Sequence, residues 1–248
     1  MRSLADLAVF ALLLAAVRFN SAGPQNPDQG PREYVVLLHG LGRTHRSLEK
    51  LATSLASQGY SVVNVEYPTL EQSIEYLADE ALHPEIERIR RSSPDNIHFV
   101  THSMGGIVVR YYLQHQPLEN LGRVVMLSPP NQGSELVDRM KSVPLIEKLL
   151  SPAARELGTD RESLPVKLGR PAFELGVIAG KKSHNPLNSL IIDGPDDGTV
   201  SVKSARIVGM NDFLVLPYSH RSILKSDEVI NQVLHFLKHG AFKREPGG

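Results

Sequence analysis

The chain contains no cysteine among its 248 residues. This absence excludes disulfide bonds, thiolate nucleophiles, cysteine-based zinc sites and attachment of a lipid to an N-terminal cysteine. Neither charge is in excess, because 27 Lys and Arg side chains balance 27 Asp and Glu side chains, giving a formal net charge of +0. Without a basic field to attract phosphate groups, we expect no nucleic-acid partner.

The N-terminal apolar run, from Leu7 to Val17, is too short for a comfortable membrane-spanning helix. Arg2 precedes this run and a polar tail follows it, which is the pattern of a secretory signal peptide. We predict a signal peptide or N-terminal anchor over residues 1–22, then a linker over residues 23–33. The protein is then expected to be periplasmic or secreted, with membrane anchoring or an ordinary N-terminal helix as alternatives.

Residues 34–248 read as one domain, since a chain that is 41% hydrophobic and 22% charged can bury one sizeable core. Short apolar runs alternate with segments of helical periodicity. This order predicts an α/β fold with a mostly parallel central sheet flanked by helices. We expect strands at 34–40, 61–68, 96–103, 123–130, 174–180 and 212–220, and helices at about 48–56, 72–92 (with or without a break at Pro84), 104–116 and 226–239.

The stretch FVTHSMGGIVVRYY, residues 99–112, joins a predicted strand to a predicted helix at Ser103. A serine at such a turn is held in a strained conformation and can act as a nucleophile. Gly105 meets the glycine-x-serine-x-glycine pattern, whereas Thr101 stands where the first glycine belongs. Serine is also a common N-cap residue, so this stretch favours a nucleophile and leaves a capping role open.

A nucleophilic serine needs an orienting carboxylate and a base, which in this topology follow it in that order. Asp197 lies in a glycine-rich turn after the fifth predicted strand, and His220 comes at the end of the last one. Function gathers at the carboxyl ends of the strands in open α/β sheets. We therefore predict a triad of Ser103, Asp197 and His220, with Asp196 and then Asp193 as alternative acids.

Four segments carry a family resemblance: HGLG (39–42), THSMGG (101–106), DDGTVSV (196–202) and YSHRSIL (218–224). Together they resemble the alpha/beta-hydrolase superfamily and, within it, bacterial lipases and esterases. The resemblance covers about residues 34–239. It implies the alpha/beta-hydrolase fold and a serine hydrolase acting on carboxylic esters, with no metal or other cofactor.

The resemblance also implies an oxyanion hole. In such hydrolases the amides come from the residue after a His-Gly pair and from the residue after the nucleophile, here Leu41 and Met104. The aspartate before the glycine of an Asp-Gly-x-Val segment is the catalytic acid, which selects Asp197 over Asp196. Thr101 departs from the family pattern, although some bacterial lipases carry alanine there.

Residues 131–172 read as an insertion after the fourth strand, where hydrolases of this fold build a helical cap. Its apolar side chains are expected either to line an acyl pocket or to pack the cap onto the core. An apolar cap would favour acyl chains. A small-molecule ester or a lipid is the expected substrate, and the neutral net charge leaves proximity to a membrane open. These side chains are Leu136, Val137, Met140, Leu145, Ile146, Leu149 and Leu150.

Several alternatives stay open, because the same triad performs every kind of acyl transfer. They include a thioesterase, an amidase, a phospholipase, an acyltransferase and a non-catalytic binding protein of this fold. Acyl chain length and oligomeric state are also open. His235 and His239 could form half a metal site on the last predicted helix, but no acidic residue lies near them and we interpret them as solvated.

Overall fold

The computed structural model describes residues 32–244. The predicted signal peptide and nearly all of the predicted linker lie outside these residues. Among the described residues, no helix combines the length and apolar character that crossing a membrane requires.

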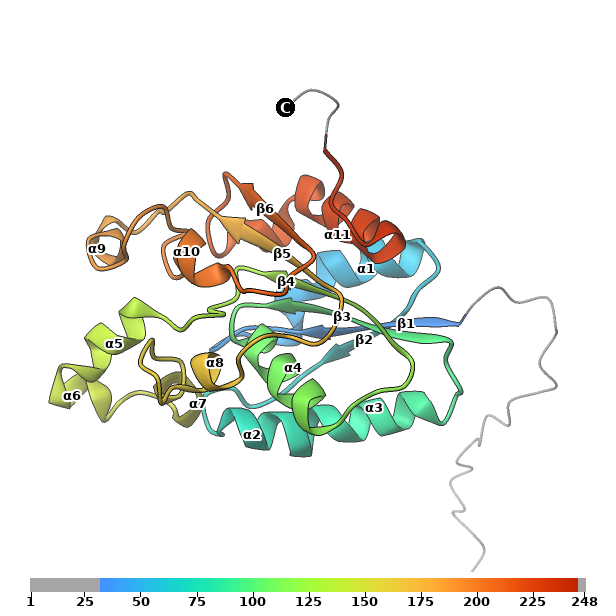
Figure 1. Cartoon of the computed structure of the whole chain (residues 1–248), viewed down its shortest axis with the longest axis horizontal. Helices are drawn as coiled ribbons and strands as arrows, with labels where there is room; N and C mark the ends of the chain where they lie inside the picture. The colour runs from blue at the N-terminus through green and yellow to red at the C-terminus, as the bar shows by residue number, and fades with distance from the viewer. Residues whose placement is uncertain (1–31, 245–248) are drawn as a thin grey trace, which may run out of the picture. The chain divides into compact units, whose positions relative to one another are not determined.

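The centre of the molecule is a six-stranded sheet in which every neighbouring pair of strands is parallel (Figure 1). The strand order is β2-β1-β3-β4-β5-β6. This confirms the predicted α/β class. The strands are β1 (Glu33–Leu38), β2 (Ser61–Val65), β3 (Asn96–His102), β4 (Leu121–Leu127), β5 (Leu175–Gly180) and β6 (Asp212–Leu216).

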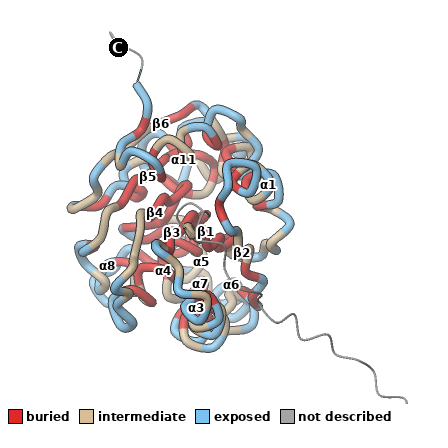
Figure 2. Tube along the Cα trace, turned by 90° about the vertical axis from the view of Figure 1, so that its right-hand side faces the viewer, coloured by how far each residue is buried: buried red, intermediate tan, exposed pale blue. Residues whose placement is uncertain are grey.

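The sheet carries a hydrophobic core on each face, because side chains alternate along a strand. In β1, Val35 and Leu37 face one core, whereas Val36 and Leu38 face the other, and all four are buried. Figure 2 shows this burial concentrated along the central strands. The first core packs against α1 (Glu49–Ser57) and α11 (Asp227–His239), and the second against α2 (Ile74–Tyr76), α3 (His83–Arg90) and α4 (Met104–His115).

The helix expected at 72–92 is not broken at Pro84, although its hydrogen-bond pattern changes from α-helical to π-helical just before this residue. A π-helical segment, η2 (Leu77–Leu82), joins α2 to α3, and Pro84 lies in the first turn of α3. Proline lacks an N–H group and clashes with the preceding turn of an α-helix. The wider π-helical turn just before it removes that conflict, so the helix continues without a break.

The predicted cap segment, 131–172, contains four short helices beyond the carboxyl end of the sheet (Figure 1). A backbone hydrogen bond joins the cap segment to the rest of the domain: the N–H of Ala153 donates to the carbonyl of Gln72 at 3.2 Å. The helices are α5 (Glu135–Lys141), α6 (Pro144–Glu147), α7 (Pro152–Arg155) and α8 (Leu164–Lys167). Other connections contain the short helices η1 (His45–Leu48), α9 (Pro186–Ser189), α10 (Val202–Ala205) and η3 (Ser222–Lys225).

Candidate active site

Ser103 stands between β3 and α4 with φ of 53° and ψ of −127°. A positive φ is uncommon for a residue with a side chain, and here it marks a strained strand-to-helix turn. The serine occupies the N-cap position of α4, yet its side chain accepts no hydrogen bond from the helix. The capping role that the sequence left open is therefore not the role of this hydroxyl.

The glycines after Ser103 allow the close packing of the turn. A Cβ on Gly105 would lie 2.6 Å from the carbonyl oxygen of Leu38, which is too close for any side chain. A Cβ on Gly106 would lie 3.3 Å from Oγ1 of Thr101. Thr101 is fully buried and fits because its neighbour across the turn is glycine.

His220 and Asp197 form a direct pair. Nδ1 of His220 lies 2.7 Å from Oδ2 of Asp197, and the backbone N–H of His220 donates to the Asp197 carbonyl at 2.9 Å. The other carboxylate oxygen, Oδ1, accepts the N–H groups of Thr199 at 3.0 Å and Val200 at 2.8 Å. A carboxylate fixed in this way holds the imidazole with its proton on Nδ1 and its lone pair on Nε2.

The two alternative acids lie elsewhere. Oδ1 of Asp196 accepts the N–H of Gly198 at 2.6 Å and the hydroxyl of Ser189 at 3.1 Å, so this buried carboxylate stabilises the turn itself. Asp193 is exposed, and its carboxylate lies 3.8 Å from the ammonium group of Lys203. Of the three aspartates considered from the sequence, the structure brings Asp197 to the histidine.

A cavity of about 270 Å³ connects these parts, with Ser103 and His220 in its wall. No hydrogen bond joins these two side chains in the structure, an arrangement common in enzymes without bound substrate. An apolar part of the wall comes from the cap. It contains Leu136, Val137, Met140, Leu150, Ala154 and Leu157.

The predicted oxyanion residues are Leu41 and Met104. Leu41 lines the cavity, and Met104 is the first residue of α4. Within residues 32–244, neither of their N–H groups donates to a backbone carbonyl outside its own helix. The loop that carries Leu41 is fixed, since the N–H of Gly42 donates to Oγ1 of Thr69 at 2.9 Å. Two amides without backbone partners beside a serine are what an oxyanion hole needs.

His102 contacts both the backbone and the ring of His220. Its Nε2 lies 2.9 Å from the backbone carbonyl of His220, and the two rings are 4.6 Å apart between centroids. Burial, together with the nearby His220, lowers the pKa of His102 well below its ordinary value. A neutral His102 with its proton on Nε2 donates to that carbonyl and so positions the loop that carries His220.

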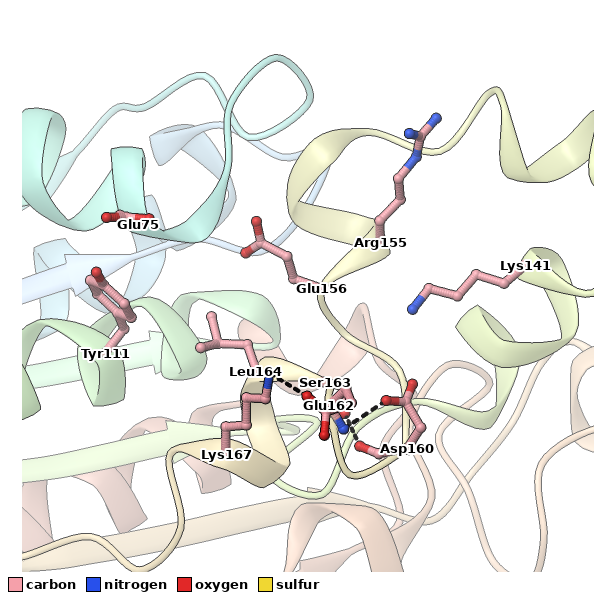
Figure 3. A pocket seen from close by; sticks show the side chains of 10 residues that line it. All are labelled: Glu75, Tyr111, Lys141, Arg155, Glu156, Asp160, Glu162, Ser163, Leu164 and Lys167. Carbon is pink, nitrogen blue, oxygen red and sulfur yellow. Dashed lines mark hydrogen bonds and ion pairs between the residues drawn. The ribbon is translucent and has the colours of Figure 1, made fainter.

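A second cavity, of about 380 Å³, lies between the cap segment and the body (Figure 3). Charged side chains of both signs line it, among them Glu75, Lys141 and Glu156. Oε2 of Glu156 accepts the N–H of Ile74 at 3.0 Å, which ties the cap segment to α2. This cavity includes neither Ser103 nor His220, and we interpret it as the seam between cap and body.

The histidine pair on α11 has no acidic companion. The rings of His235 and His239 lie 4.4 Å apart between centroids, and Nδ1 of His235 pairs with the backbone carbonyl of Ala241. Among the described residues, no group of three or more His, Asp or Glu side chains could hold a metal ion.

The model of the alpha/beta hydrolase family matches residues 35–217 of this chain. The chain belongs to the alpha/beta hydrolase family. No match was found among curated protein sequences.

Solved structures show the same hydrolase fold at low identity. The lipase BlEst2 of Bacillus licheniformis in its propeptide form is 20% identical with a TM-score of 0.69, and the match covers 90% of this chain and 54% of that one. In the mature form the identity is 20%, the TM-score 0.65 and the coverage 87% and 96%. The esterase EaEST of Exiguobacterium antarcticum is 17% identical with a TM-score of 0.59, and the match covers 85% of this chain and 93% of that one.

Three features of this hydrolase site were not found from the sequence. Arg43 and Arg221 line the same cavity as His220. The one sequence signal for them is that Arg43 directly follows HGLG and Arg221 directly follows His220. Gly180 ends β5, and a Cβ there would lie 2.3 Å from the carbonyl of Tyr218 and 2.8 Å from Cβ of Asp197. The glycine lets the loops that carry Asp197 and His220 approach each other, a contact between distant segments that spacing along the chain does not reveal.

Proposed function

We propose that the protein is a serine hydrolase that cleaves carboxylic esters through an acyl-enzyme on Ser103. One observation carries this proposal. His220, whose Nδ1 lies 2.7 Å from the Asp197 carboxylate, lines the same cavity as a serine in a strained strand-to-helix turn. A buried pair of this kind has no evident structural need for a serine at its side, whereas acyl transfer requires all three groups.

In the proposed mechanism, Nε2 of His220 takes the proton of Ser103 as its Oγ attacks the ester carbonyl. Asp197 accepts the Nδ1–H throughout and stabilises the imidazolium. The amides of Leu41 and Met104 bind the tetrahedral oxyanion, and the positive end of the α4 dipole adds to their effect. His220 then returns the proton to the departing alcohol. Water, activated by the same histidine, releases the acid.

The cavity wall supports an apolar acyl group. The cap side chains Leu136, Val137 and Met140 line the same cavity as the serine. Burying methylene groups against such a wall contributes roughly 0.8 kcal/mol for each group that leaves water. We therefore propose that the acyl chain lies toward the cap.

The test is a chain-length series of p-nitrophenyl esters assayed with the wild type, Ser103→Ala and Ser57→Ala. Ser57 is an exposed serine at the end of α1 and serves as the matched control. We expect Ser103→Ala to lose at least about a thousandfold in kcat, as for other triad nucleophiles, and Ser57→Ala to match the wild type.

A fluorophosphonate probe gives an independent readout, since it labels only an activated serine. Labelling should occur on wild-type protein and Ser57→Ala and be absent from Ser103→Ala. Equal ester turnover by wild type and Ser103→Ala, or labelling that survives this substitution, would refute the assignment.

A further inference from the structure

Two arginines, Arg43 and Arg221, line the same cavity as His220. Arg43 follows the loop that carries Leu41, and Arg221 directly follows the histidine. Arg43 is half-buried and Arg221 exposed. Among residues 32–244, neither guanidinium forms an ion pair, whereas Arg88, Arg90, Arg123 and Arg244 each do.

No carboxylate in the cavity wall balances the two arginines. The cavity wall includes no Asp or Glu side chain. A neighbouring polar hollow of about 600 Å³ shares Thr199, His220 and Arg221 with the cavity. It adds Lys225, and its one acid is Asp197, which is already paired with His220.

The two positive charges also act on each other. Burial and the charge of Arg221 lower the pKa of Arg43 below its ordinary value. Two like charges at the mouth of a partly desolvated cavity cost free energy unless an anion joins them. The backbone of Arg43 is held in a tight turn, because its N–H donates to the carbonyl of Gly40 at 3.2 Å.

The chemistry of acyl transfer decides which part of a substrate meets the arginines. The leaving oxygen must approach Nε2 of His220 to receive its proton. Groups next to His220 therefore face the alcohol part of the ester, while the apolar cap wall faces the acyl part. An arginine fork binds phosphate or carboxylate oxygens through charge-assisted hydrogen bonds.

We propose that Arg43 and Arg221 form a subsite for an anionic group, phosphate or carboxylate, on the alcohol part of the ester. This inference rests on the proposed function and names the substrate class of the same site. The substrate then combines an apolar acyl chain with a negatively charged alcohol.

The experiment compares two matched pairs of soluble substrates below the concentration at which they aggregate. One pair is octanoyl-glycerophosphate and monooctanoylglycerol, and the other is octanoyloxybenzoate and octanoyloxybenzamide. For at least one pair, we expect wild-type kcat/KM to favour the anionic member by about tenfold or more, the gain from one charge-assisted contact. The pair that shows the larger ratio identifies phosphate or carboxylate as the preferred anion.

The double variant Arg43→Gln/Arg221→Gln should lose this ratio, whereas Arg46→Gln should keep it. Arg46 carries the same charge nearby but does not line the cavity. Salt should also reduce the wild-type ratio, because exposed charges are screened. Equal rates on both members of each pair, or a ratio that survives in the double variant, would overturn the proposal.

Binding to Ser103→Ala separates this proposal from the proposed function, because it needs no turnover. Calorimetry should show tighter binding of octanoyl-glycerophosphate or octanoyloxybenzoate than of its neutral counterpart, and the added Arg43→Gln/Arg221→Gln change should remove the difference. If Ser103→Ala retains ester turnover while the binding preference holds, the proposed function fails and the subsite stands. If turnover depends on Ser103 but no binding preference exists, only the subsite fails.

Discussion

Two neighbouring aspartates in the turn after α9 have different partners. Both are buried, at 6% exposure for Asp196 and 2% for Asp197. Asp196 accepts a hydrogen bond within the turn. One carboxylate oxygen of Asp197 also accepts a hydrogen bond within the turn, whereas its other oxygen pairs with His220. The same residue type therefore stabilises a loop at one position and orients an imidazole at the next.

This difference predicts opposite effects of two matched substitutions. In Asp197→Asn, the amide oxygen can still accept the turn N–H groups, but the amide nitrogen then faces Nδ1 of His220 and favours the wrong tautomer. We expect kcat to fall by about a thousandfold or more with little loss of stability. Steady-state kinetics on a p-nitrophenyl ester and urea denaturation measure the two quantities.

Asp196→Asn is the control. It weakens the hydrogen bonds that Asp196 accepts from Gly198 and Ser189, so we expect a loss of about 1 kcal/mol in the free energy of unfolding. Its kcat should stay within a few-fold of wild type. A larger kcat loss in Asp196→Asn than in Asp197→Asn would show that the acid has been assigned to the wrong residue.

At the scale of elements, the cap divides into two parts. Leu136, Val137, Met140 and Leu150 line the cavity, while Leu145 and Leu149, at and after α6, are 74% and 80% exposed. The cap side chains were expected either to line the pocket or to pack on the core, and the two exposed leucines do neither. Part of the apolar surface of the cap neither lines the pocket nor packs on the core.

The cap gives a prediction that depends on its geometry. Leu136→Trp places a larger side chain in the wall of a cavity of about 270 Å³ and so reduces the space left for substrate. The longest acyl chains should then no longer fit. We expect the chain-length optimum to shift to shorter p-nitrophenyl esters, with at least about a tenfold loss in kcat/KM on the longest ones.

Leu149→Trp is the matched control, because it adds the same volume on an exposed part of the cap. Its chain-length profile should coincide with that of the wild type. An unchanged optimum in Leu136→Trp would place the acyl chain outside the cavity.

The regular elements were predictable because their signals are local. The apolar run before Ser103 predicts β3, and the glycines after it are typical of a helix packed closely on a strand. Contacts between distant segments were not predictable. The hydrogen bond from His102 to the carbonyl of His220 joins residues 118 positions apart, and no spacing rule indicates it.

At the scale of the whole molecule, three buried histidines make the free energy of unfolding depend on pH. Burial lowers the pKa of His39, His98 and His102 below the ordinary value of 6.5, so the folded protein keeps all three neutral. Nε2 of His39 and Nδ1 of His102 have no hydrogen-bond partner among the described residues. The Glu66 carboxylate lies 4.0 Å from Nε2 of His39, and its charge offsets only part of the effect of burial there.

The sign of the effect follows from proton counting. Below about pH 6.5 the unfolded chain binds protons at these histidines that the folded protein does not, so the free energy of unfolding falls as the pH falls. Each histidine contributes up to about 1.4 kcal/mol per pH unit until its folded pKa is reached. Urea denaturation near pH 7.5, 6.5 and 5.5 should show a flat region followed by a steep loss.

The variant His102→Gln should reduce the slope of the free energy of unfolding against pH by the equivalent of up to one bound proton. The Gln amide can still donate to the carbonyl of His220, and it does not titrate. His239→Gln, at the exposed end of α11, should leave the slope unchanged. Equal slopes in the wild type and His102→Gln would mean that His102 takes up its proton inside the folded protein, and the neutral state assigned to it beside His220 would be wrong.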